Sequence, residues 1–168
     1  LLREKMIEFQ KILETGNLSC AVSVLHQALD IDAKSFHANH NLALIYLDQA
    51  LLSENSSFLF EKAKRYCARA LWYHGDQIVK KNDLISCVDL MANIYFQQNN
   101  FEAARDEYRK IIELDPSNLT ARYNLGCSYY NLGDLEQAEM RWIEIVDQEE
   151  KTESKAIQDE KEAEIHSL

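Results

Sequence analysis

The sequence predicts an all-α fold in which antiparallel helix pairs stack side by side, and three observations lead to this prediction. Residues 91–95 are matched by residues 125–129, and the same offset of 34 residues relates Tyr108 to Trp142. A fixed period in this range is typical of stacked repeats. The 168 residues include only one proline and four glycines, which favours helix almost throughout. Small and large residues also recur in phase within each period.

Each repeating unit shows the pattern expected of two helices that cross closely. Small residues stand where the backbones would approach, and large residues would fill the space beside them. The small residues are Ala92, Ala104, Gly126 and Ala138, and the large ones are Tyr95, Tyr108, Tyr129 and Trp142. Asn99 followed by Asn100, and Gly133 followed by Asp134, signal the turn inside each unit. Pro116 ends the second helix of one unit, because proline has no backbone N–H to donate.

In this phase, residues 85–152 resemble the tetratricopeptide repeat family, whose unit is a helix–turn–helix of 34 residues. The resemblance implies a right-handed α-solenoid that closes with a C-terminal capping helix. Two departures from the family pattern are visible. The tryptophan that the family often carries early in its first helix is replaced by Val88 and Arg122, and the proline that closes a unit is present at Pro116 but replaced by Glu150 in the next unit.

The same phase, followed along the chain, predicts one domain over residues 1–168. Its expected parts are repeats at 2–35, 36–84, 85–118 and 119–149, and a capping helix at 150–168. The second repeat carries two insertions, around residues 51–60 and 74–83, and we expect the first one to lengthen its helices. At this end of the chain, residues 147–166 contain eight acids and three lysines with a sparse apolar stripe, which suits a polar outer face. That stripe is Ala156, Ile157, Ala163 and Ile165.

Charge and composition exclude several classes of function. The formal net charge of −10 argues against a nucleic-acid binder, which would show a basic face. No apolar run reaches the roughly 20 residues that a membrane helix needs, so no membrane insertion is expected. We expect a cytoplasmic protein, although the chain opens without methionine and leaves a preceding targeting segment open. The four cysteines form no Cys-x-x-Cys pair, which favours reduced, mostly buried thiols.

No catalytic motif is present, so we expect neither an enzyme nor a cofactor. The sequence lacks a phosphate-binding glycine loop, a His-Glu-x-x-His motif and a nucleophile elbow. His37 and His40 lie one helical turn apart, a spacing at which two histidines can bind one metal ion. No third ligand stands at a suitable spacing, so we interpret them as polar residues of a helix surface.

The family resemblance implies that the first helix of each unit lines a concave groove. The predicted peptide-binding residues there are His37, His40, Asn41, Asp89, Asn93, Phe96, Tyr123, Asn124, Tyr130 and Asn131. The same phase adds Met6, Ile7, Gln10, Leu44, Leu90, Gln97 and Cys127. An asparagine side chain both donates and accepts hydrogen bonds, so it can bind a peptide backbone of any sequence, and aromatic walls add apolar contact.

We therefore predict a non-catalytic module, a scaffold or chaperone-like adaptor, that binds an extended peptide segment of a partner protein. The predicted groove residues include few basic side chains, which disfavours the family subtype that binds chaperone C-terminal carboxylates. Two alternatives stay open. One is a structural protein that assembles with copies of itself, and the other is capture of a basic partner by the acidic C-terminal helix.

Overall fold

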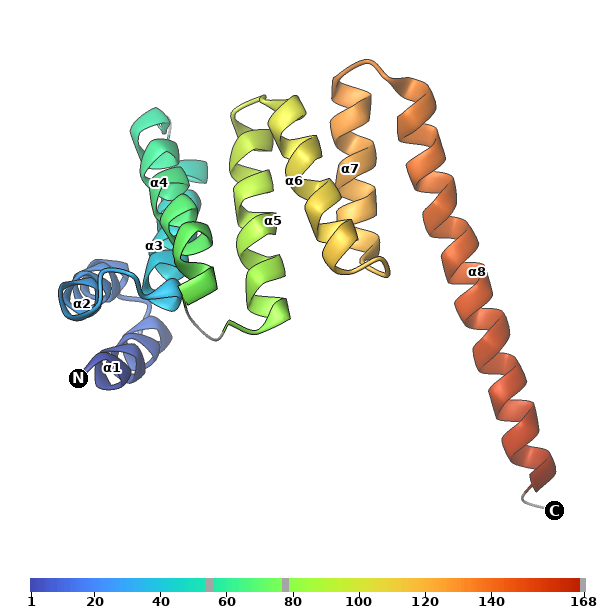
Figure 1. The fold of residues 1–168 in the computed structure, drawn as a ribbon, viewed down its shortest axis with the longest axis horizontal. Coiled ribbons are helices and arrows are strands. Elements are labelled where there is room, and N and C mark those ends of the chain that lie inside the picture. Colours follow the sequence, from blue (N-terminus) through green and yellow to red (C-terminus); the bar gives the residue numbers. More distant parts are fainter. Residues whose placement is uncertain (54–55, 77–78, 167–168) are drawn as a thin grey trace.

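The structure, a computed structural model, describes residues 1–53, 56–76 and 79–166, with the side chains of Asp76 and of residues 156–166 left out. No strand occurs in these ranges. The elements are α1 (Leu2–Glu14), α2 (Leu18–Ile31), α3 (Phe36–Leu51), α4 (Ser57–Tyr73), the 3₁₀ turn η1 (His74–Asp76), α5 (Lys81–Gln97), α6 (Phe101–Leu114), α7 (Leu119–Asn131) and α8 (Leu135–His166). Successive helices pack as antiparallel pairs, and the α1–α2 pair lies across the direction of the others (Figure 1).

The turns inside the pairs use the residues that the sequence marked. Gly16, Asn99 and Gly133 follow the first helices and hold positive φ angles of 73°, 59° and 81°. Glycine and asparagine tolerate this left-handed conformation best, and it ends a helix sharply. The next residue of each turn caps the following helix, because its side-chain oxygen accepts a backbone N–H three residues on. These caps are Asn17, Asn100 and Asp134.

Two apolar clusters form the core, and they meet at α5. One extends from α1 to α5 and the other from α5 to α8, while Leu71 and Tyr95 pack against both. The predicted small positions are buried as expected. Gly126 shows why: a Cβ atom placed there would lie 2.3 Å from Nε1 of Trp142. The indole of Trp142 therefore packs directly on the backbone of α7, and only glycine leaves room for it.

The second repeat lengthens its helices, as its spacing predicted. α3 has 16 residues and α4 has 17, whereas α1 and α2 have 13 and 14. Residues 54–55 and 77–78, which belong to the two predicted insertions, lie outside the described residues. α5 begins at Lys81, four residues before the predicted start of the third repeat at residue 85. Asp83 lies in the first turn of this helix, where a carboxylate stabilises a helix N-terminus.

The C-terminal end differs from the prediction of a helix up to residue 149 followed by a separate cap at 150–168. α8 is one helix of 32 residues that continues well past the end of α7 (Figure 1). The physical reason is the absence of a breaker, because the chain has no glycine or proline after Gly133 and Glu150 stands where Pro116 ends the previous unit. The side chains of the predicted apolar stripe and residues 167–168 lie outside the described residues.

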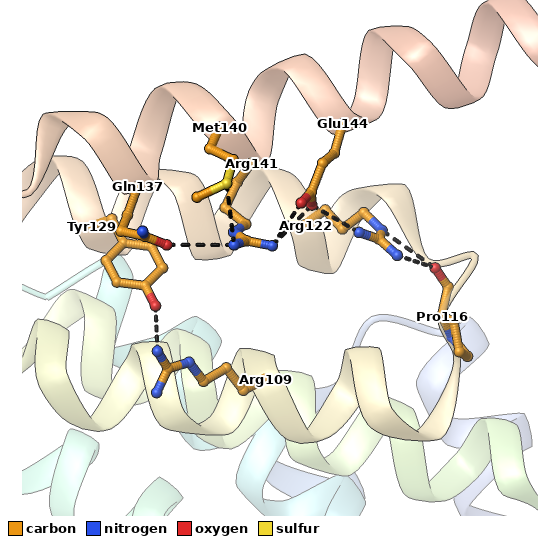
Figure 2. Close-up of polar contacts among 8 residues, drawn as sticks. All are labelled: Arg109, Pro116, Arg122, Tyr129, Gln137, Met140, Arg141 and Glu144. Carbon is orange, nitrogen blue, oxygen red and sulfur yellow. Dashed lines mark hydrogen bonds and ion pairs between the residues drawn. The ribbon is translucent and has the colours of Figure 1, made fainter.

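Arginines join the last three helices through polar contacts (Figure 2). Arg122 on α7 donates from Nη2 to the carbonyl oxygen of Pro116 at 2.6 Å, and its Nη1 lies 2.9 Å from a carboxylate oxygen of Glu144 on α8. Arg109 on α6 donates to the hydroxyl of Tyr129 on α7. Arg122, which replaces the tryptophan of the family pattern, thus ties the turn before α7 to α8.

Candidate functional site

The ten predicted groove residues lie on α3, α5 and α7, the first helices of their pairs, and none is fully buried. His37, Tyr123, Tyr130 and Asn131 are exposed, and the other six are half-buried. Leu90, which the same phase placed in the groove, is only 4% exposed and belongs to the core. That part of the prediction is wrong, because α5 packs against both neighbouring clusters and has less free surface than the spacing indicated.

A cleft of about 530 Å³ opens between α1 and α3. It brings the predicted residues His37 and Asn41 together with Met6, Ile7 and Gln10 of α1. The complete lining is Leu2, Arg3, Met6, Ile7, Phe9, Gln10, Leu13, Ser35, His37 and Asn41. Apolar side chains line most of this cleft, and the polar groups of His37, Asn41, Gln10 and Arg3 stand among them. This combination is common in sites that bind small molecules or peptide side chains.

The two histidines pack on one aromatic ring. His40 stacks on Phe36 with ring centroids 5.8 Å apart, and His37 meets the same ring edge-on at 5.4 Å. Nε2 of His37 lies 3.7 Å from Oδ2 of Asp83, which links α3 to α5. Burial and the neighbouring His37 lower the pKa of His40, while Asp83 acts in the opposite sense. Nε2 of His40 is buried and has no hydrogen-bond partner among the described residues.

On α5, two candidates form a hydrogen-bonded chain with α6. Asn93 donates from Nδ2 to Oδ2 of Asp89 at 2.9 Å, and its Oδ1 accepts from the hydroxyl of Tyr108 at 3.0 Å. Burial raises the pKa of Asp89, against the effect of the hydrogen bond from Asn93. Burial and the nearby Asp89 raise the pKa of Tyr108. Asn93 therefore keeps one N–H and one lone pair for a ligand.

Tyr123 and Tyr130 of α7 lie beside the last helix, and their contact with it was missed by sequence reasoning. They are 56% and 58% exposed, and their ring centroids lie 6.4 Å and 6.2 Å from that of Trp142 on α8. Trp142 also donates from Nε1 to the carbonyl oxygen of Tyr123 at 3.3 Å. Helical spacing would have shown it, because Tyr123, Gly126 and Tyr130 fall on one side of α7.

The remaining amides and Phe96 contact their own neighbourhood. Asn41 donates to the carbonyl of His37, and Asn131 to that of Cys127, each at 2.8 Å. Phe96 packs edge-on against Phe101 with centroids 5.2 Å apart. The described residues show no hydrogen bond or ring contact between the candidates on α5 and those on α7. The structure thus forms three local groups, one on each of α3, α5 and α7.

The cysteines follow the prediction in part. Cys67 and Cys87 are buried at the contact of α4 with α5, with their Sγ atoms 3.6 Å apart. Their mutual hydrogen bond and burial raise the pKa of the Cys67 thiol. Cys127 is half-buried, and Cys20 is exposed near the start of α2, where the expectation of burial was wrong.

None of the helices in the described ranges combines the length and hydrophobicity that crossing a bilayer requires.

Comparison with known proteins supports the repeat assignment. The model of the TPR repeat matches residues 92–133, and that of the tetratricopeptide repeat matches residues 120–149. No sequence among curated proteins matches the chain.

Solved structures share the fold at low identity. MamA 41-end from Desulfovibrio magneticus RS-1 aligns over 90% of this chain and 77% of its own, with 14% identity and a TM-score of 0.72. A MamA RS-1 ArsTM double mutant aligns over 91% of this chain and 78% of its own, with 14% identity and a TM-score of 0.74. A tetratricopeptide repeat protein from Parabacteroides merdae ATCC 43184 aligns over 89% of this chain and 54% of its own, with 20% identity and a TM-score of 0.73.

The repeat pattern, the helix pairs and these matches agree with one another. Tetratricopeptide repeats form a protein-interaction fold and are generally non-enzymatic. Residues 92–149 therefore contain tetratricopeptide repeats, and these repeats support, in general terms, a scaffold for protein–protein interaction.

Proposed function

We propose that the chain is a non-catalytic adaptor whose concave face binds an extended peptide segment of a partner protein. The observation that carries this proposal is the cleft between α1 and α3, whose lining combines apolar side chains with the polar side chains of His37 and Asn41. An apolar side chain of a peptide fits such a cleft, while the polar groups meet its backbone.

The asparagines of the face have the hydrogen-bonding capacity that this mode requires. A side-chain amide offers two N–H donors and two acceptor lone pairs. Asn41 and Asn131 use one N–H each within the protein, and Asn93 uses one N–H and one lone pair. Asn124 makes no side-chain hydrogen bond with the described residues. Each amide can therefore still bond a peptide backbone without breaking an internal contact.

The dimensions also suit an extended segment. A strand-like peptide rises about 3.3 Å per residue, and packed helices lie roughly 8–10 Å apart, so each repeat meets about three peptide residues. The candidates on α3, α5 and α7 would then contact successive stretches of one peptide. Tyr123 and Tyr130, both more than half exposed, would hold its far end against an aromatic surface.

The experiment is a selection of peptides from a random displayed library against the chain, followed by titration of the best peptide. We expect Asn93→Ala combined with Asn124→Ala to lower the affinity for that peptide by about tenfold or more, since the variant loses its amide contacts with the peptide. Because Asn93 also bonds Asp89 and Tyr108, the melting temperature of this double variant should fall, and binding is therefore compared well below the melting temperatures of both proteins. Asn118 is not substituted in this experiment, because its side chain caps α7 and does not face the groove.

The matched control is Gln27→Ala, which removes an exposed amide from α2, a second helix outside the groove. It should leave the affinity unchanged. If the double variant binds as well as the wild type and removal of residues 150–168 abolishes binding, the acidic end of α8 is the binding site and the proposal is wrong. A mass that rises with concentration, measured by light scattering, would instead favour self-assembly.

A further inference from the structure

The last helix carries an exposed apolar surface at the end of the stack, outside the groove. Trp142 is half-buried, and Ile143 and Val146 are 52% and 53% exposed. A cleft of about 270 Å³ lies there, lined by these three residues with Glu139 and Asp147. The rings of Tyr123 and Tyr130 adjoin it through their contacts with Trp142. We call Trp142, Ile143 and Val146 the end face.

The preceding repeat shows what such a surface receives. The counterparts of Trp142, Ile143 and Val146 one period earlier are Tyr108, Arg109 and Ile112 of α6. There the next helix, α7, lies beside Ile112, while Arg109 stays exposed. Tyr108 is 1% exposed, Ile112 packs in the cluster that includes α7, and the guanidinium of Arg109 lies 5.6 Å from the ring centroid of Tyr129.

The helix that covers α6 also defines the shape of a matching partner. α7 presents Ala121, Leu125 and Tyr129 to the shared cluster, at positions i, i+4 and i+8 of one helix. This is an apolar stripe on one side of an α-helix. Because α8 repeats the receiving positions of α6 and no described helix lies on that side of it, the end face fits a helix with such a stripe.

Charge determines which helix fits. Glu136, Glu139, Asp147 and Glu150 are exposed on the same side of α8 as Ile143, and none of them is in an ion pair with a described residue. Lys151 and Lys155 lie near Asp147 and Glu150, so the uncompensated negative charge is strongest toward Glu136 and Glu139. A partner helix with lysine or arginine beside its apolar stripe would neutralise these acids.

We propose that the end face is a second docking surface, and that it binds an amphipathic helix of a partner protein with basic residues flanking the apolar stripe. A second copy of this chain fits less well. A two-fold contact would place the same acids of both copies against one another, and like charges in an interface are unfavourable. The surface is separate from the peptide groove, so it stands or falls independently of the proposed function.

The test uses the whole chain with Trp72→Phe, so that Trp142 is the remaining tryptophan and reports on the end face. Trp72 is 82% exposed, so this change leaves the core intact. The probe is a synthetic helical peptide with leucine at positions i, i+4 and i+8 and lysines on both sides of the stripe. We expect it to shift the Trp142 emission to shorter wavelength and to bind less tightly as salt rises.

Two control peptides separate the two parts of the proposal. One replaces the lysines with glutamates, and the other keeps the composition of the first but scrambles the stripe. Each should bind at least about tenfold more weakly than the probe, because each lacks either the charge match or the apolar contact. Equal binding by either control, or no binding of the probe, would overturn the proposal.

Variants of the chain locate the contact. Ile143→Glu combined with Val146→Glu should lower the affinity for the probe at least about tenfold. Leu51→Glu is the matched control, because Leu51 is also 52% exposed on a helix but lies at the end of α3. The groove variant Asn93→Ala with Asn124→Ala should bind the probe normally. Unchanged binding by the end-face variant, or a light-scattering mass that shows a dimer through this face, contradicts the proposal.

Discussion

Gly126 and Trp142 form the closest backbone approach described between α7 and α8. A side chain at position 126 would meet the indole at 2.3 Å, so Trp142 would have to leave its place on α7. We expect Gly126→Leu to lower the free energy of unfolding by on the order of 1–3 kcal/mol through overpacking. Gly75→Leu is the control, since a Cβ there meets nothing within 4 Å. Equal melting temperatures of the two variants would show that α7 and α8 do not pack as described.

Asp89 makes stability depend on pH in a direction that follows from its surroundings. Burial raises its pKa above the ordinary value of about 4, so the folded state holds its proton to higher pH than the unfolded state does. Stability from this group is greatest when it is protonated and falls as pH rises from the ordinary pKa through the raised one.

The variant Asp89→Asn removes this titration while keeping an oxygen that can accept from Asn93. We expect the variant to melt at a higher temperature than the wild type at pH 7 and at nearly the same temperature at pH 3, where Asp89 is protonated. Thermal melts of both proteins across this range measure the difference. A gap that grows toward low pH would contradict the burial of this carboxyl.

At the scale of the helices, the sequence predicted most where a residue controls the backbone. Asn99, Gly133 and Pro116 stand at the ends of helices because each favours or forces a backbone conformation that interrupts them. α5 begins within the predicted insertion at 74–83, because Asp83 is compatible with a first helical turn. α8 was misjudged because the family resemblance implied a cap, although Glu150 offered no physical reason for a break.

The candidate site depended more on tertiary contacts and was less predictable. Spacing placed the candidate residues on the first helices of their pairs, and it also contained the relation between Tyr123, Gly126 and Tyr130. The cleft between α1 and α3 and the link from Asn93 to Tyr108 bring together residues of different helices. Local periodicity carries no information about such contacts, so they required the structure.

Arg122 connects three elements, and its loss should be measurable. Its guanidinium contacts Pro116 in the turn before α7 and Glu144 on α8, and its side chain is 18% exposed. We expect Arg122→Ala to lower the free energy of unfolding by about 1 kcal/mol, since the contacts are partly shielded from water. Lys110→Ala, which breaks the exposed pair with Glu107, should change it by less than about 0.5 kcal/mol. Denaturant titrations giving equal values for both variants would contradict this role.

Across the whole molecule, charge is distributed unevenly. Acids are concentrated on α8, whereas the candidate groove residues include one carboxylate, Asp89. Binding in the groove should therefore vary only weakly with salt, and binding at the end face should be screened strongly. This contrast separates the two surfaces even when both bind peptides.

The most direct measurement of the central claim, that the concave face binds an extended peptide, is amide hydrogen exchange of the chain with and without a peptide selected from the random library. The account predicts slower exchange in the first helices α1, α3, α5 and α7, where the peptide would lie. Exchange in the outer helices α2, α4 and α6 should change little. Protection confined to α8, with the first helices unaffected, would contradict the account.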